Sequence, residues 1–247
     1  MLETINVTKN FGGFTALKEV SLKLEEGELR GLIGPNGSGK TTLFNVISGV
    51  LKPNKGVIKF QGHDISSLSP DKICHLGIAR TFQIPRPFRN MTVIENVILG
   101  VIFGERIREK DIPDPCGEAQ NYLQLVGLNI KDHTTPNELT AAGLKRLELA
   151  RAIATKPKLL LADEFLSGLN REEIDQSSNI LRKIRDEMGI TIIWIEHIMS
   201  ALMNLVDRVT VLNYGEKIAE GTPQEVAANK DVIEAYLGKE TSDVATD

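Results

Sequence analysis

The sequence predicts an α/β fold in which a helical segment is inserted between two halves of one core. Three observations support this prediction. A glycine-rich stretch at residues 34–42 lies between a predicted strand and a predicted amphipathic helix, and apolar runs at 159–162 and 191–195 are typical of buried strands. Residues 85–139 differ from the rest of the chain in composition, with five prolines and with apolar residues at helical spacing. With 247 residues, the chain is long enough to bury a full core.

The glycine-rich stretch reads GPNGSGKTT from Gly34 to Thr42 and fits the pattern G-x-x-x-x-G-K-[ST] at every fixed position. Such a pattern arises by chance in roughly one chain per hundred of this size. The predicted strand at 28–33 and helix at 42–47 supply the context that the motif needs. Its glycines let backbone N–H groups point at phosphates, and the helix directs its positive end at the same charge. The sequence therefore predicts a P-loop NTPase whose loop binds a nucleoside triphosphate through Asn36, Gly37, Ser38, Gly39, Lys40, Thr41 and Thr42.

The remaining elements follow in chain order. Residues 20–24 and 57–60 read as half-buried strands, and residues 209–219 read as a hairpin followed by a helix that Thr222 caps. The polar residues 241–247 are expected to form a flexible tail. Apolar spacing of three to four residues predicts helices around 93–101 and 122–126, over 144–154, and over 171–188, the last ended by Gly189.

Composition limits the class of partner. The net charge of −4 and the pI near 5.7 give no general attraction to nucleic acid. The longest apolar stretches fall far short of the roughly 20 residues that span a bilayer. The first residues lack the pattern of a secretion signal, and Cys74 and Cys116 are too isolated for a disulfide framework. We expect a reducing, cytoplasmic setting, inert thiols and no nucleic-acid partner.

A second half of the nucleotide site is predicted where Asp163 and Glu164 follow the apolar run 159–162. Asp163 is placed to hold magnesium opposite the loop, and Glu164 to polarise the attacking water. Two solvated acids at a strand end are the alternative. His197 follows the predicted strand 191–195, at the edge where α/β sheets bind ligands.

The phosphate loop, Thr81-Phe82-Gln83, the LADE run ending at Glu164 and the IEH run ending at His197 together resemble the ATP-binding subunits of ABC transporters. The resemblance covers nearly the whole chain and implies ATP and Mg2+ as cofactors. It places Phe11 against adenine with Ala16 beside it, although ordinary edge packing also explains Phe11. It assigns catalytic roles to Glu164, His197 and Gln83, and magnesium contacts to Thr41, Gln83 and Asp163.

The same resemblance implies how the chain is organised. One domain is expected over 1–247, with a RecA-like core and an antiparallel β subdomain at 1–84 and 150–240. A helical subdomain is expected at 85–149 and a flexible tail at 241–247. Ser167 begins a loop that, in this family, meets a partner subunit.

The sequence at residues 80–83, 88–96 and 221–238 is similar to that of the ATPase subunits of branched-chain amino-acid importers. This similarity implies integral membrane permease partners that dock near Pro85–Asn96 and a second ATPase subunit, either identical or different. It also implies an extracytoplasmic solute-binding protein that acts indirectly, and a peripheral position on the cytoplasmic face of the membrane for a protein that is soluble when isolated. The ATPase subunits of importers of urea or short amides share much of this sequence, so it does not identify the transported solute.

The family signature Leu-Ser-Gly-Gly-Gln is degenerate in this chain, where Leu139, Thr140, Ala141, Ala142 and Gly143 occupy its place. In the family this segment crosses a dimer interface to contact the γ-phosphate of the other subunit. Thr140 can replace the serine hydroxyl and cap the following helix, whereas the two alanines add methyl groups where close backbone approach is expected. Phe165 replaces a usual proline without changing a reacting group.

Several alternatives remain open at this point. In the first, the dimer closes with somewhat reduced affinity and hydrolyses ATP as usual. In the second, this subunit pairs with a different ATPase subunit and one composite site is impaired. A cluster-assembly scaffold, or an interaction subunit that hydrolyses ATP poorly, is also compatible with the chain. Chromosome and repair ATPases are disfavoured because no coiled-coil heptads separate Lys40 from Leu139.

Overall fold

The computed structural model describes residues 1–104, 112–131 and 133–237 and contains two sheets. The antiparallel sheet has the order β2-β1-β4-β5, and the six-stranded sheet has the order β10-β9-β3-β8-β7-β6. The first comprises β1 (Leu2–Phe11), β2 (Phe14–Leu24), β4 (Lys55–Phe60) and β5 (His63–Asp64). The second comprises the parallel strands β3 (Leu29–Ile33), β6 (Ile78–Arg80), β7 (Leu159–Asp163), β8 (Thr191–Ile195) and β9 (Arg208–Asn213), with β10 (Glu216–Gly221) antiparallel at one edge.

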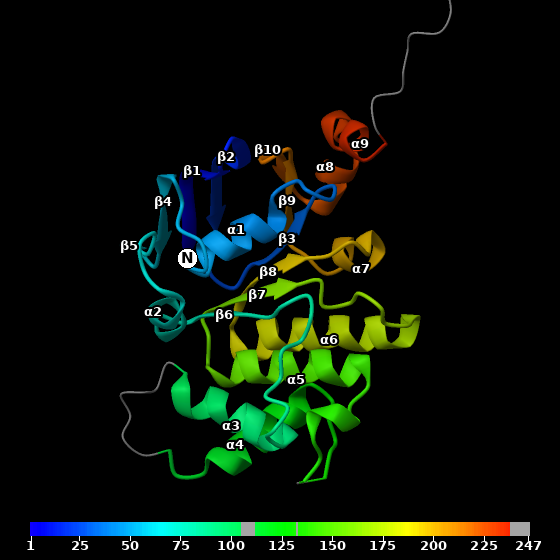
Figure 1. The fold of residues 1–247 in the computed structure, drawn as a ribbon. Coiled ribbons are helices and arrows are strands. Elements are labelled where there is room, and N and C mark those ends of the chain that lie inside the picture. Colours follow the sequence, from blue (N-terminus) through cyan, green and yellow to red (C-terminus); the bar gives the residue numbers. More distant parts are fainter. Residues whose placement is uncertain (105–111, 132, 238–247) are drawn as a thin grey trace, which may run out of the picture.

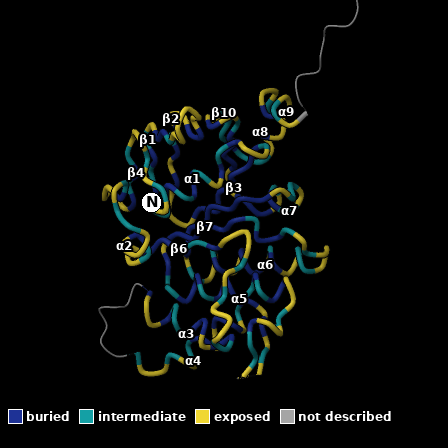
Figure 2. Tube along the Cα trace, viewed as in Figure 1, coloured by how far each residue is buried: buried dark blue, intermediate teal, exposed yellow. Residues whose placement is uncertain are grey.

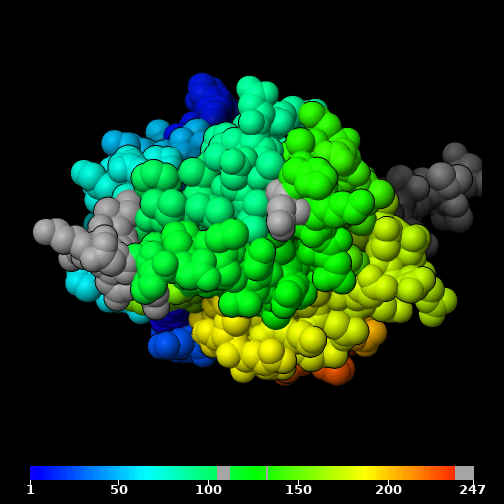
Figure 3. Space-filling view, turned by 90° about the horizontal axis from the view of Figure 1, so that it is seen from below, coloured from blue at the N-terminus to red at the C-terminus, as the bar shows by residue number. Residues whose placement is uncertain are grey.

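Helix α1 (Lys40–Ile47) lies between the two sheets, and the longer helices cover the other face of the six-stranded sheet (Figure 1). This arrangement confirms the α/β class with an inserted helical segment. Seen from below, the insert and α6 share one face of the molecule (Figure 3). The other helices are α2 (Pro70–His75), α3 (Val93–Phe103), α4 (Pro115–Leu125), a 3-10 turn (Pro136–Glu138), α5 (Ala141–Ala154), α6 (Arg171–Met188), α7 (Met199–Met203), α8 (Pro223–Ala227) and α9 (Lys230–Leu237).

The central strands β7 and β8 are buried along their whole length, as the dark tube in Figure 2 shows. Successive side chains of a strand point to opposite faces, so each strand serves two cores. Leu159 and Leu161 pack with α1 and the antiparallel sheet, while Leu160 and Ala162 pack with the helices on the other side. Continuous apolar strands of this kind predict a sheet covered on both faces, as observed.

Several predicted elements lie within three residues of their expected bounds, whereas β2 and α4 begin six and seven residues earlier than predicted, at Phe14 and Pro115. α6 spans the predicted residues and ends at Gly189, which adopts φ 67°. α5 begins at Ala141, three residues earlier than predicted, because the Thr140 side chain accepts a hydrogen bond from Gly143 and caps the helix there. The helix runs unbroken through residues 149 and 150, where the subdomain boundary is predicted. The predicted tail at 241–247 lies outside the described residues.

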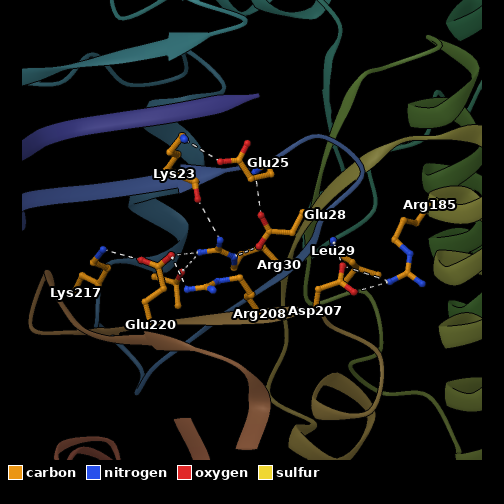
Figure 4. Close-up of polar contacts among 11 residues, drawn as sticks. Lys23, Glu25, Glu28, Leu29, Arg30, Arg185, Asp207, Arg208, Lys217 and Glu220 are labelled. Carbon is orange, nitrogen blue, oxygen red and sulfur yellow. Dashed lines mark hydrogen bonds and ion pairs between the residues drawn. The ribbon is translucent and has the colours of Figure 1, made fainter. Parts of the chain in front are cut away.

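A buried ionic network ties β2, β3, β9 and β10 together (Figure 4). Arg30 on β3 is only 2% exposed and donates to Glu28 and Glu220 at 2.5 and 2.6 Å. It also donates to the Thr210 hydroxyl and to the carbonyl of Lys23 on β2. A buried guanidinium needs such partners, because an unpaired buried charge is strongly destabilising. The network fixes the strand that leads into the phosphate loop.

Within the described ranges, no helix is both long enough and apolar enough to cross a membrane.

Candidate nucleotide site

The phosphate loop connects β3 to α1, and its shape depends on glycine at two positions. Gly39 is the residue before α1 and has φ 104°, and a Cβ there would lie 2.7 Å from the carbonyl oxygen of Ala16. At Gly34 a Cβ would lie 2.0 Å from the carbonyl oxygen of Leu212. Among the residues that the structure describes, no side chain caps α1 with a hydrogen bond. The free amide groups of its first turn therefore suit an anion.

A pocket of about 280 Å³ opens beside the loop and contains every residue predicted to bind ATP. The Ser38 hydroxyl is buried and has no hydrogen-bond partner in the described part of the chain. A buried polar atom without a partner is costly, so a phosphate oxygen suits this position. The pocket is lined by Phe11, Phe14, Ala16, Asn36, Gly37, Ser38, Gly39, Lys40, Thr41, Thr42, Glu164 and His197.

Lys40 is 6% exposed and donates to the carbonyl oxygens of Gly34 and Pro35 at 2.8 and 3.0 Å. Burial lowers the pKa of its ammonium group, and the nearby carboxylates of Glu164 and Asp163 oppose that shift. The ammonium group is thus folded back onto its own loop, where it lines the pocket as a single positive charge.

The three residues predicted to be catalytic meet at the carboxylate of Glu164. Gln83 donates to one oxygen at 2.6 Å, and the His197 Nε2 lies 2.9 Å from the other. Glu164 itself has φ 46°, a conformation that costs free energy for a residue other than glycine and that clusters at functional sites. These residues come from three separate segments of the chain, and the carboxyl edge of the sheet brings them together.

Asp163 at the end of β7 is 3% exposed and pairs with Arg80 at 2.9 Å. Burial raises the pKa of the Asp163 carboxyl, and Arg80 opposes the shift through its hydrogen bond and its charge. Arg80 also donates to Asn45 on α1 at 2.6 Å, which fastens α1 to the sheet. The contacts of Arg80 with Asp163 and Asn45 were not predicted, because no local sequence pattern indicates a contact between residues so far apart in the chain.

The segment Leu139–Gly143 lies at the start of α5 and does not line the nucleotide pocket of its own chain. Thr140 and Ala141 are exposed, whereas Ala142 and Gly143 are buried. The exposed start of α5 is therefore free to meet another molecule. Phe165 is 3% exposed and packs in the core beneath the site.

Phe14 is a pocket residue that sequence reasoning missed. It lies opposite Phe11 across the turn between β1 and β2, and the two rings are 64% and 47% exposed. The sequence pattern that could have identified Phe14 is the pair of phenylalanines that flank Gly12-Gly13. Exposed aromatic rings beside a phosphate site offer a surface on which a base can stack.

Together, the glycine-rich loop, the buried Asp163 and the cluster around Glu164 define a P-loop nucleotide hydrolase. A family model for ABC transporters matches residues 17–167, and one for the branched-chain amino acid ATP-binding cassette transporter matches residues 216–241. The chain belongs to the ABC transporter family, whose ATP-binding cassettes are ATPases coupled to transport.

Three similar proteins illustrate the match. The high-affinity branched-chain amino acid transport ATP-binding protein BraF of Pseudomonas aeruginosa is 36% identical over 97% of this chain and 98% of its own length. A nucleotide-free ATP-binding cassette from an ABC transporter has a TM-score of 0.86 and 33% identity, over 97% of this chain and 99% of that one. A dimeric cassette bound to ADP and Pi in a post-hydrolysis state has a TM-score of 0.81 and 28% identity, over 90% and 99%.

Proposed function

We propose that this ATPase energises the uptake of branched-chain or related amino acids through integral membrane permease subunits, at the cytoplasmic face of the membrane. The match of residues 216–241 to the branched-chain cassette model carries this proposal. Its support is the BraF protein, which is similar over its full length and is named for transport of those amino acids. An extracytoplasmic binding protein then selects the solute. This chain acts on that binding protein indirectly, through the permease subunits.

Hydrolysis requires two such cassettes arranged head to tail, with ATP between the phosphate loop of one and the exposed start of α5 of the other. Lys40 and the amide groups of the loop hold the phosphates, and Phe11 carries the base. Glu164 accepts a proton from the attacking water, while His197 and Gln83 fix its carboxylate by the hydrogen bonds described above.

The oxygen donors of Thr41, Gln83 and Asp163 fit magnesium, which prefers hard oxygen ligands and keeps several waters. Asp163 is buried at the end of β7, adjacent to Glu164, and Thr41 lines the pocket. When bound with ATP, the ion supplies charge neutralisation at the phosphates.

The docking surface for a permease lies over a groove of about 610 Å³ between the core and the insert. Phe82 and Phe88 line it. Arg80 and Arg86 lie over the Phe82 ring at 5.0 and 5.6 Å, and Arg151 lies over the Phe88 ring at 4.7 Å. The groove begins next to Gln83, so a segment bound there can move the glutamine that contacts Glu164. Pro85 and Pro87 belong to the predicted surface at Pro85–Asn96 but do not line the groove.

Purification of the tagged chain from detergent-solubilised membranes tests the proposal. We expect integral membrane partners to copurify, and we expect Arg86→Glu to lose them while still hydrolysing ATP, because Arg86 lines the groove and not the nucleotide pocket. Exclusively soluble partners would favour the cluster-assembly alternative. Recovery of permeases whose transport assay responds to urea or an amide, and not to leucine, would correct the solute.

The degenerate signature leads to a further prediction, based on the hypothesis that it weakens the contact with the partner's ATP. Ala141 is exposed, so its methyl group faces the partner, whereas Ala142 is buried within its own chain. We expect Ala141→Gly to raise the kcat of the purified homodimer by about threefold, and Ala142→Gly to have less effect. Each glycine costs up to about 1 kcal/mol of helix stability, which the unfolding temperature monitors. Unchanged turnover in the double variant would refute the hypothesis.

A further inference from the structure

Lys145 lies in α5, five residues after Thr140, and the residue is 8% exposed. It donates to the carbonyl oxygen and the hydroxyl of Ser167 at 2.5 and 2.8 Å, and to the carbonyl oxygen of Glu164 at 3.1 Å. These three acceptors satisfy all three donors of the ammonium group. No carboxylate is among them, so the lysine holds a loop of main chain.

The loop held by Lys145 runs from Glu164 to Ser167 and is fastened on its other side by Glu196. Glu196 is 1% exposed, and its carboxylate accepts hydrogen bonds from the N–H groups of Leu166 at 2.6 Å and His197 at 2.9 Å. Lys145 and Glu196 therefore connect α5 to both of the segments that carry Glu164 and His197.

The contact of Lys145 with the loop bears on the backbone conformation of Glu164. Its φ of 46° persists only where neighbouring groups hold it. Three hydrogen bonds do so. The Glu164 N–H donates to the Ile195 carbonyl at 2.9 Å, and the Glu164 carbonyl accepts from Lys145 at 3.1 Å and from the Ser167 N–H at 3.3 Å. A displacement of α5 thus pulls directly on the residue whose side chain faces the nucleotide pocket.

We propose that Lys145 is a positioning residue that transmits contact between the start of α5 and a nucleotide held by a second cassette to Glu164 of its own site. The inference rests on the head-to-tail pairing proposed above. One rigid element, α5, is enough to carry a displacement from Thr140 to Lys145, because the two residues are separated by about 7.5 Å along this helix. Burying an ammonium group costs free energy that an apolar side chain would avoid, which is consistent with a role beyond packing.

Lys145→Met tests the transmission, because it removes the three donors and keeps an unbranched side chain. We expect kcat for ATP to fall at least tenfold, while the Kd of the isolated subunit for ATP stays within twofold. Lys145→Arg keeps charge and donors and should return kcat to within about threefold of wild type. Arg146→Met is the matched control: Arg146 is the next residue on α5 and donates to Gly127 and Gln176, away from the pocket.

A second measurement separates transmission from pairing. On a Glu164→Gln background, which should pair stably with ATP, Lys145→Met should leave the ATP-dependent dimer seen by size exclusion unchanged. Loss of that dimer, or turnover of Lys145→Met equal to that of Arg146→Met, would overturn the proposal. If Glu164→Gln alone fails to pair, the head-to-tail arrangement is wrong and the inference falls with it. Should Lys145→Met fail to fold, Ser167→Ala removes one acceptor and is expected to lower kcat about threefold, and no change would also overturn the proposal.

Discussion

Glu164→Gln is expected to lower ATP turnover at least 100-fold and to leave the Kd for ATP within about threefold. A positioned general base contributes about 10² to 10⁴ in rate, and glutamine cannot accept the proton of the attacking water. The substitution keeps the size of the side chain and an oxygen for the Gln83 amide, which donates to Glu164 at 2.6 Å. Binding should survive, because the groups that hold the phosphates lie in the loop at 34–42.

Steady-state phosphate release, together with equilibrium binding of ATP, measures the two effects separately. Glu187→Gln serves as the control, since Glu187 is an exposed glutamate on α6. Retention of turnover by Glu164→Gln would place the base elsewhere in the pocket, and loss of binding would show that Glu164 helps to hold the nucleotide.

Lys40→Met is expected to weaken ATP binding by about 10- to 100-fold, because a charge-assisted hydrogen bond is worth about 1.5–3 kcal/mol. The free protein loses the two hydrogen bonds from Lys40 to the carbonyls of Gly34 and Pro35 but also loses a buried charge, so its stability should change little. Burial lowers the pKa of the Lys40 ammonium group, and methionine fills a similar volume without a buried charge, which offsets part of the lost hydrogen bonding.

Thermal unfolding with and without ATP distinguishes this outcome from a folding defect. Ligand at 100 times its Kd adds about 2.7 kcal/mol of stability, and a 10- to 100-fold weaker affinity should leave only about 1.4 to 0.4 kcal/mol of this gain in Lys40→Met at the same ATP concentration. Lys55→Met, at an exposed position on β4, should keep the full gain. A variant that unfolds early without ATP would instead assign Lys40 a structural role.

Much of the fold could be predicted because local patterns coincide with it. The periodicity of 171–188 and Gly189 locate α6 at its observed bounds, and the capping residues Thr140 and Thr222 occupy their predicted places. The start of α5 was misplaced because Ala-Ala-Gly carries no apolar stripe, although the cap at Thr140 marks the true first turn.

The nucleotide pocket was largely predictable for a different reason. Its motifs consist of residues whose chemistry requires a particular spacing, and the topology then brings the strand ends together. The supporting contacts could not be predicted. Arg80 with Asp163, Lys145 with Ser167, and Glu196 with Leu166 are pairs whose sequence separations range from 22 to 83 residues and follow no local rule. Their geometry exists only once the chain has folded.

The position of β3 has a consequence for how the protein is made. β3 pairs with β8 and β9, so the strand that leads into the phosphate loop ends at residue 33, while its neighbours begin at residues 191 and 208. At about 5–20 residues per second, a ribosome takes on the order of 10 s to add the intervening chain. The complete phosphate-loop motif is therefore synthesised well before the two strands that flank β3 in the folded sheet.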